Sequence, residues 1–126
     1  MHLDTHAVVW LYESGTDTFP ATARSLVDSE PLAISPMVAL ELALLHEIGR
    51  IAPPPEAILA NLRRTLGLVT SPTPFADVVG AATELTWTRD PFDRLICAQA
   101  VAENQLLLTK DRNIRKHLAL ARWDAG

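Results

Sequence analysis

The chain has 126 residues, of which 48% are hydrophobic and 21% charged, a balance typical of one globular domain rather than a disordered or fibrous protein. Its formal net charge of −4 disfavours a protein coated with nucleic acid over its whole surface. A single cysteine, Cys97, excludes an internal disulfide, and no Cys/His spacing of the zinc type is present.

The sequence also lacks the features of an exported or membrane-embedded protein. No basic stretch precedes the short apolar run at residues 7–12, so a secretory signal is not predicted. No apolar run approaches membrane-spanning length, because Glu41 interrupts the longest candidate. We therefore expect a cytoplasmic protein that makes no contact with membranes.

Short apolar runs alternate with helical patterns along the first half of the chain. Residues 1–3 form a strand candidate that ends at Asp4, and residues 32–34 read as a second, buried strand. Ser35 suits the cap of the following helix, because its side chain can accept from backbone N–H groups, and Pro36 fits the first turn. The helices predicted here cover about 6–13, a segment that opens at 19–20 and includes 23–27, and about 36–48.

The second half continues this alternation after a stiff connector of three prolines at 53–55. Apolar residues at helical spacing and capping residues predict helices over 56–66, 75–85, 91–103 and about 113–120. Strands are predicted at 68–70, 106–109 and, at the sheet edge, 122–123. Short buried strands that alternate with helices are typical of a parallel sheet covered on both faces, so we expect one α/β domain over residues 1–126.

Glu41 is the most informative single residue. It is the only charged side chain from residue 31 to residue 45, inside a helix that is apolar on nearly all sides and is therefore predicted to be largely buried. A lone buried carboxylate is costly unless it is paired or bound to metal. Glu41 therefore needs a metal ion, an arginine or access to solvent, and these alternatives remain open at this point.

Three further acids are predicted to gather near Glu41. Asp4 and Asp111 each follow a predicted strand, and Asp93 lies in the first turn of the helix that Asp90 caps. Ligands of open parallel sheets collect beyond the carboxyl ends of the strands, which is where these acids would meet. Each acid also has an ordinary interpretation as a helix cap or turn residue. Together they suit Mg²⁺, which prefers oxygen ligands.

Charge and aromatic residues are distributed unevenly. Residues 1–60 carry two basic and eight acidic side chains, whereas residues 89–126 carry seven basic and five acidic ones, a balance of +2. That segment could attract anions once its acids hold metal, although charge alone favours a solvated helix surface. The aromatic residues among apolar neighbours are expected in the core, and no aromatic–basic stripe predicts stacking on bases; they are Trp10, Phe75, Trp87 and Phe92.

Four segments, in order and over nearly the whole chain, resemble the motifs of PIN-domain ribonucleases. They are Asp4-Thr5-His6, the stretch 35–43 around Glu41, the stretch 90–100 that begins Asp-Pro-Phe-Asp-Arg, and the stretch 107–114 around Thr109 and Asp111. The combination is specific, although no single motif is. The compact length and the form of the motifs look most like the VapC-type toxins of toxin–antitoxin pairs.

This resemblance implies a PIN-like three-layer α/β/α domain with a central, mainly parallel sheet of about four to five strands. It implies a Mg²⁺- or Mn²⁺-dependent endoribonuclease that is usually a homodimer and is inhibited by an antitoxin. RNA would be the substrate (tRNA, rRNA or mRNA), and DNA would be reached only through the antitoxin. The residues that match the metal-binding acids are Asp4, Glu41, Asp93 and Asp111, with Asp90, Thr109 and Arg94 as auxiliary residues.

Other functions remain open on the sequence alone. A phosphatase of the haloacid type would need Asp-x-Asp near the start, and residue 6 is His. A related PIN nuclease that processes rRNA or acts on DNA ends, without an antitoxin, also remains open. In a non-enzymatic binding module, the acids would only cap helices and balance arginines.

Overall fold

The computed structural model describes residues 1–125, in which five two-residue strands form one parallel sheet; residue 126, the last of the predicted domain, lies outside the described part. The sheet has the order β3-β2-β1-β4-β5, so the first strand of the chain lies at its centre. His2 of β1 is in register with Ala33 of β2 and with Leu107 of β4. The strands are β1 His2–Leu3, β2 Ala33–Ile34, β3 Val69–Thr70, β4 Leu107–Leu108 and β5 Ala121–Arg122.

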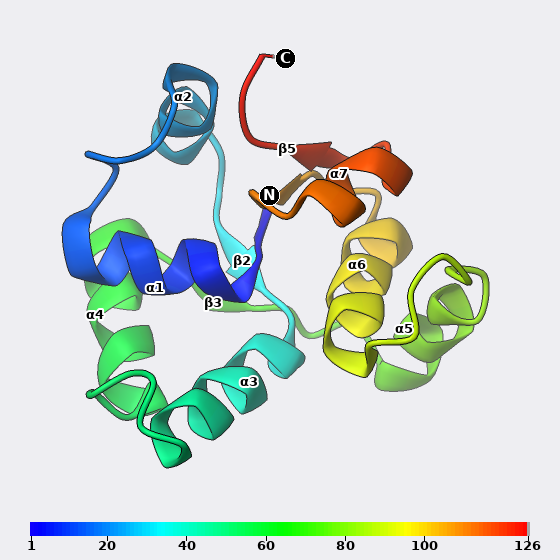
Figure 1. The fold of residues 1–126 in the computed structure, drawn as a ribbon, viewed down its shortest axis with the longest axis horizontal. Helices are drawn as coiled ribbons and strands as arrows, with labels where there is room; N and C mark the ends of the chain where they lie inside the picture. Colours follow the sequence, from blue (N-terminus) through cyan, green and yellow to red (C-terminus); the bar gives the residue numbers. More distant parts are fainter. Residues whose placement is uncertain (126) are drawn as a thin grey trace.

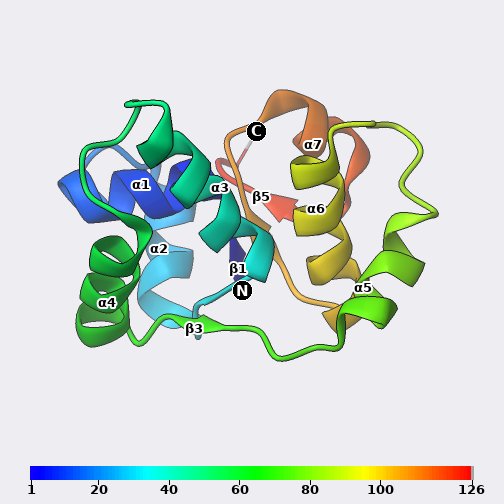
Figure 2. The ribbon, with the colours of Figure 1, turned by 90° about the horizontal axis from the view of Figure 1, so that it is seen from below.

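Seven helices surround this sheet within the described residues, and none of them is long and apolar enough to cross a membrane. They are α1 Thr5–Ser14, α2 Ala21–Ser29, α3 Pro36–Glu47, α4 Pro55–Leu66, α5 Phe75–Ala82, α6 Pro91–Glu103 and α7 Arg112–His117. Figures 1 and 2 show α1, α2 and α4 on one side of the strands and α5, α6 and α7 on the other, with α3 between the two groups. The expected three-layer α/β/α architecture and its parallel sheet are confirmed.

Local sequence signals explain where several elements begin and end. The Ser35 side chain accepts from the backbone N–H of Met37 at 3.1 Å, which starts α3 as expected. Gly67 ends α4 in the left-handed region, with φ of 69°, where a residue without Cβ is favoured. The core lies on the central strands, where Leu3, Leu107 and Leu108 are fully buried. This rigid centre positions the residues that follow each strand.

Several boundaries differ from prediction, most of them by one or two residues. Helix α5 ends at Ala82 instead of residue 85; Thr83 is its C-cap, and the Thr83 hydroxyl donates to the Gly80 carbonyl. Helix α7 ends at His117, and strand β5 begins at Ala121, one residue earlier than expected. Trp123 follows that strand and is buried, 4.8 Å from the Phe19 ring, so it closes the core.

Helix α3 is not largely buried, which corrects the expectation from its composition. Val38 and Leu42 face the core, whereas Leu40 is 49% exposed, Leu44 38% and Ile48 67%. A helix beside a sheet can bury only the face that it turns inward, and here the outward face is apolar as well. Phe75, expected in the core, is also exposed, at the first position of α5.

Candidate active site

Four acids from four different elements line one pocket of about 300 Å³. Asp4 follows β1, Glu41 lies in α3, Asp93 lies in the first turn of α6, and Asp111 precedes α7. Strands β1 and β4 are parallel neighbours, so the residues that follow them, Asp4 and Asp111, emerge at the same edge of the sheet. The structure thus brings together the four acids that the sequence pattern grouped.

Asp4 is held firmly between two elements. Its carboxylate is almost fully buried, with Oδ1 accepting from the backbone N–H of Thr5 at 2.8 Å. Its Oδ2 accepts from the hydroxyl of buried Thr109 at 2.7 Å. The Thr109 Oγ1 in turn accepts from the backbone N–H of Asp111 at 3.1 Å. Asp4 therefore starts helix α1 and lines the pocket at the same time, so its interpretations as a cap and as a site residue are compatible.

Glu41 finds a hydroxyl partner rather than an arginine. The Thr5 side chain donates a short hydrogen bond to Oε1 of Glu41, and no ion pair within residues 1–125 joins Glu41 to a basic residue. Burial raises the pKa of Glu41, an effect that the Thr5 hydrogen bond opposes and that repulsion from Asp4 and Asp90 reinforces. The Thr5 hydrogen bond therefore offsets only part of the free energy that burial adds to ionisation of Glu41.

Asp93 shows the strongest electrostatic perturbation in the pocket. Burial, followed by repulsion from four neighbouring carboxylates, raises the pKa of Asp93 to about 7; these neighbours are Asp4, Asp90, Asp111 and Glu41. Within the described residues, the Asp93 carboxylate accepts no hydrogen bond. It is therefore an acid whose negative charge is disfavoured in the protein alone and would be favoured beside a cation.

The two aspartates of the third motif have different surroundings. Asp90 is exposed, and its Oδ1 accepts from the backbone N–H groups of Phe92 and Asp93 at 2.9 and 3.1 Å, which starts α6. Asp93 lies one turn further and lines the acidic pocket, whereas Asp90 is not among its lining residues. The helix cap and the pocket acid are therefore separate residues.

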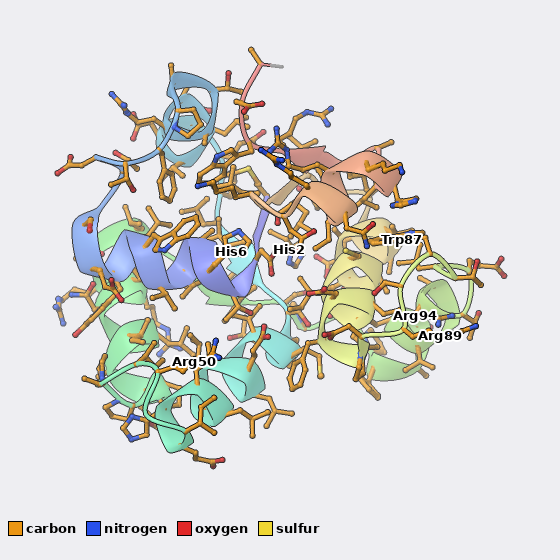
Figure 3. All side chains as sticks on the ribbon, viewed as in Figure 1. His2, His6, Arg50, Trp87, Arg89 and Arg94 are labelled. Carbon is orange, nitrogen blue, oxygen red and sulfur yellow. The ribbon has the colours of Figure 1, made fainter. Side chains whose placement is uncertain are left out.

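Arg94 does not contact an acid, contrary to one expectation from the motif. Its guanidinium donates to the carbonyl groups of Ala82 at 2.7 Å, Thr83 at 3.3 Å and Thr88 at 3.3 Å. Figure 3 shows Arg94 beside α5, on the side of α6 away from His6. The side chain fastens the segment between α5 and α6, and we assign it no role at the pocket.

Two pocket residues, Thr5 and Arg50, were not predicted from the sequence. Thr5, whose hydroxyl contacts Glu41, was part of the first motif and could have been found there. Arg50 lines the pocket although it lies in the turn after α3, and no local pattern indicates this position. Figure 3 shows Arg50 between α1 and α3. It makes no ion pair within residues 1–125, so its charge is available to an anion near the acids.

The donors in this pocket suit a hard divalent cation. They are carboxylate and hydroxyl oxygens, which Mg²⁺ and Mn²⁺ prefer, and the carboxylates repel one another in the protein alone. As they stand, no three His, Cys, Asp or Glu side chains in residues 1–125 could hold an ion together. Mg²⁺ usually keeps several waters and needs only one or two carboxylates. Asp93, whose carboxylate accepts no hydrogen bond within the described residues, is the least restrained of the four acids.

Comparisons with known proteins agree with this geometry. The profile of the PIN domain family matches residues 1–118. Ribonuclease VapC22 of Mycobacterium tuberculosis is 32% identical over 120 residues, covering 91% of this chain and 89% of that protein. The crystal structure of VapBC2 from Rickettsia felis, bound to a DNA fragment from their promoter, contains a chain of the same fold, with a TM-score of 0.65 and 21% identity over 98% of both chains.

Proposed function

This chain belongs to the PIN domain family, and from that premise we propose that it is a metal-dependent endoribonuclease acting as the toxin of a toxin–antitoxin pair. The observation that carries the proposal is the convergence of four acids, from four elements, on one pocket at the carboxyl edge of the sheet. Helix capping alone explains Asp4 and Asp111 but gives no reason for Glu41 and Asp93 to share their pocket. The similarity to a protein named ribonuclease VapC22 supports RNA as the substrate.

The proposed metal ligands are Asp4, Glu41, Asp93 and Asp111. When bound, Mg²⁺ or Mn²⁺ would offset charge on the scissile phosphate and lower the pKa of a water for attack. The ligand carboxylates are oriented by hydroxyl groups: Thr109 holds Asp4, and Thr5 holds both Asp4, through its N–H, and Glu41, through its hydroxyl. This support fixes a charged group before the substrate arrives, which is what electrostatic catalysis requires.

Other residues of the pocket serve the substrate rather than the metal in this proposal. The Arg50 guanidinium would contact a phosphate oxygen and offset charge that develops during displacement. His6 is a poor candidate for the general base, because its Nε2 already accepts from the backbone N–H of Lys110 at 2.9 Å. In this proposal His6 lines the pocket and takes no part in proton transfer.

An antitoxin partner is part of the proposal. One structural neighbour comes from VapBC2 bound to promoter DNA, which supports a comparable assembly for this chain. The antitoxin would neutralise the enzyme by placing a basic side chain in the acidic pocket, where charge complementarity favours it. DNA contact would then come from the antitoxin and not from this acidic chain.

We also propose a homodimer in which the exposed apolar face of α3 is the contact. Leu40, Leu44 and Ile48 are spaced four residues apart and form one line along the helix, all at least 38% exposed. Helix α4, the other candidate surface, exposes Leu66 but buries Ile58 and Leu62 in the core.

Cleavage of RNA by antitoxin-free protein tests the enzymatic proposal. We expect discrete products from mixed tRNA and rRNA with Mn²⁺ or Mg²⁺, and none with EDTA or with Asp93→Asn. Asp77→Asn is the matched control, because Asp77 also lies in the first turn of a helix but is exposed and outside the pocket. Cleavage by Asp93→Asn at the wild-type rate would contradict the assignment. Absence of both cleavage and metal binding would favour a binding module.

A further inference from the structure

The acidic pocket continues into a groove along α1. Three adjoining hollows of about 300, 380 and 280 Å³ share Trp10, and the second also shares His6 and Asp111 with the acidic pocket. Lys110 lines the second and third hollows, and the third ends at Trp123. The three hollows thus adjoin one another around Trp10, with the acids at one end and Trp123 at the other.

Trp10 forms the wall of this path. Its indole packs against the core, as expected, but remains partly exposed at the rim, and it contacts Trp123 with ring centroids 5.8 Å apart. His6, one helical turn earlier, lies 4.9 Å from the same ring, and Phe19 contacts it edge-on at 6.5 Å. These ring contacts hold the indole at the rim of the core, where it lines all three hollows.

Lys110 supplies a cation at the same place. Its Nζ lies 5.5 Å from the centroid of the Trp10 ring, and the residue is exposed. No acid pairs with Lys110 within residues 1–125, in contrast to Arg115, which is bound to Asp124 at 2.7 Å. A flexible ammonium group that rests on an indole can move to a phosphate and leave the ring to a base.

His6 ties the groove to the acidic pocket. A backbone N–H can only donate, so the Nε2 of His6 that contacts the Lys110 N–H at 2.9 Å is the unprotonated nitrogen. The proton is then on Nδ1, which faces Oδ2 of Asp4 at 3.5 Å. The His6 ring therefore lies between a proposed metal ligand, Asp4, and the backbone of Lys110.

We propose that this groove binds a nucleotide next to the scissile phosphate of single-stranded RNA, with the base on the Trp10 indole and a neighbouring phosphate on the Lys110 ammonium. This inference rests on the proposed ribonuclease function and names how its substrate is held. An aromatic face beside a free cation is the combination that binds single strands without base pairing. A duplex keeps its bases stacked inside and could not use the indole.

Binding of a fluorescein-labelled single-stranded RNA tests the inference, measured by anisotropy with Mg²⁺ in an Asp93→Asn background that prevents turnover. Trp10→Leu is expected to weaken binding roughly 5- to 100-fold, the range spanned by stacking of one base. Lys110→Gln is expected to lower the slope of log affinity against log salt by about 0.7, as expected for one lost phosphate contact with a single strand. A merely structural lysine would leave this slope unchanged.

Two matched controls separate these effects from loss of the fold. Trp87→Leu removes another partly buried indole, which stacks on His117 at 5.0 Å, and Lys116→Gln removes another exposed lysine; neither lines the groove. Both should bind RNA like the parent protein. If Trp10→Leu unfolds, the salt dependence of RNA binding by Lys110→Gln still tests the groove, because Lys110 is exposed.

The outcomes distinguish this inference from the function on which it rests. Wild-type protein that cleaves RNA, with Trp10→Leu and Lys110→Gln binding as tightly as the controls and with unchanged salt dependence, would overturn the groove and leave the ribonuclease intact. Wild-type protein that neither cleaves nor binds RNA would contradict both the ribonuclease function and the proposed groove. Equal loss of affinity for single-stranded and duplex RNA in Trp10→Leu would also contradict the stacking.

Discussion

The hydroxyl of Thr109, which follows β4, donates to Oδ2 of Asp4, which follows β1, across 2.7 Å. Both residues are buried, and the same Oγ1 accepts from the backbone N–H of Asp111 at 3.1 Å. One hydroxyl therefore connects two proposed metal ligands at the ends of adjacent parallel strands. It fixes the direction of the Asp4 carboxylate and the start of the turn that carries Asp111.

Replacing Thr109 by Val should damage the site more than the fold. Valine fills nearly the same volume but cannot donate, so the buried Asp4 carboxylate loses a hydrogen bond. We expect the free energy of unfolding to fall by about 1–3 kcal/mol in a urea titration. We expect Mn²⁺ affinity, measured by calorimetry, to fall roughly 10- to 100-fold, as for other groups that orient metal ligands. Thr109→Ser keeps the hydroxyl and should retain most of the stability and most of the Mn²⁺ affinity. Mn²⁺ binding by Thr109→Val at wild-type affinity would contradict the role of Thr109 in orienting Asp4.

Asp93→Asn should stabilise the metal-free protein at neutral and alkaline pH. Burial and repulsion from other carboxylates raise the pKa of Asp93 from 3.8 to about 7, so the folded protein binds this proton more tightly than the unfolded chain does. The stability that the protonated Asp93 contributes is fully present below its ordinary pKa of 3.8. This stability is lost as the pH rises through the folded-state pKa of about 7. The melting temperature of Asp93→Asn in EDTA should therefore exceed that of wild type at pH 8, and the difference should shrink towards pH 4.

Added Mg²⁺ provides the second half of that test. It should raise the melting temperature of the wild type at pH 8 by relieving the repulsion, and it should raise that of Asp93→Asn less. Parallel pH curves for the two proteins in EDTA would show that Asp93 is not electrostatically perturbed.

The acids could be predicted from sequence because their signals are local. Glu41 is the only charge in a long apolar stretch, and Asp4 and Asp111 follow short apolar strands whose parallel pairing brings their ends together. The direction in which the Arg94 side chain points could also have been predicted from the sequence. Adjacent residues of a helix do not face each other, so an arginine next to Asp93 points away from the pocket that Asp93 lines.

The groove could not be predicted from composition, because it depends on elements distant in the sequence. Trp10 has apolar neighbours, which suggested the core, yet the spacing of His6 and Trp10 places both on one face of α1 beside the acids. Lys110 reaches that face only because β4 lies next to β1. Likewise, hydrophobic periodicity cannot tell whether an apolar face of α3 meets the core or remains exposed.

Glu103 should make the stability of the protein sensitive to acid. Burial raises the pKa of Glu103, but hydrogen bonds from Ser71, from Gln99 at 2.8 Å and from His2 at 3.0 Å outweigh it and lower the value from 4.5 to about 2. The stability from the ionised form is present above about 4.5 and is lost as pH falls towards 2. Burial also lowers the pKa of His2, so protonation of this histidine below about 6.5 destabilises the fold further.

Glu103→Gln should accordingly lower the free energy of unfolding by about 1–3 kcal/mol at pH 7, because charged hydrogen bonds to buried partners are lost. Its stability should change less than that of wild type between pH 4.5 and pH 2, as followed by urea unfolding. Glu84→Gln, at an exposed glutamate, is the control and should keep the wild-type pH dependence. An equally steep acid decline in Glu103→Gln would place the sensitive group elsewhere.

Leu44→Glu should dissociate the proposed homodimer. Leu44 is 38% exposed in the middle of the line formed by Leu40, Leu44 and Ile48, so a glutamate there would bring two charges into an apolar contact between copies. Leu66→Glu is the matched control, since Leu66 is 40% exposed on α4. Light scattering after size exclusion should give a dimer for wild type and Leu66→Glu and a monomer for Leu44→Glu. Since burying one leucine contributes about 1.5–3 kcal/mol, the dissociation constant should rise at least tenfold; a wild-type monomer, or a dimer that tolerates Leu44→Glu, would show that α3 serves another contact.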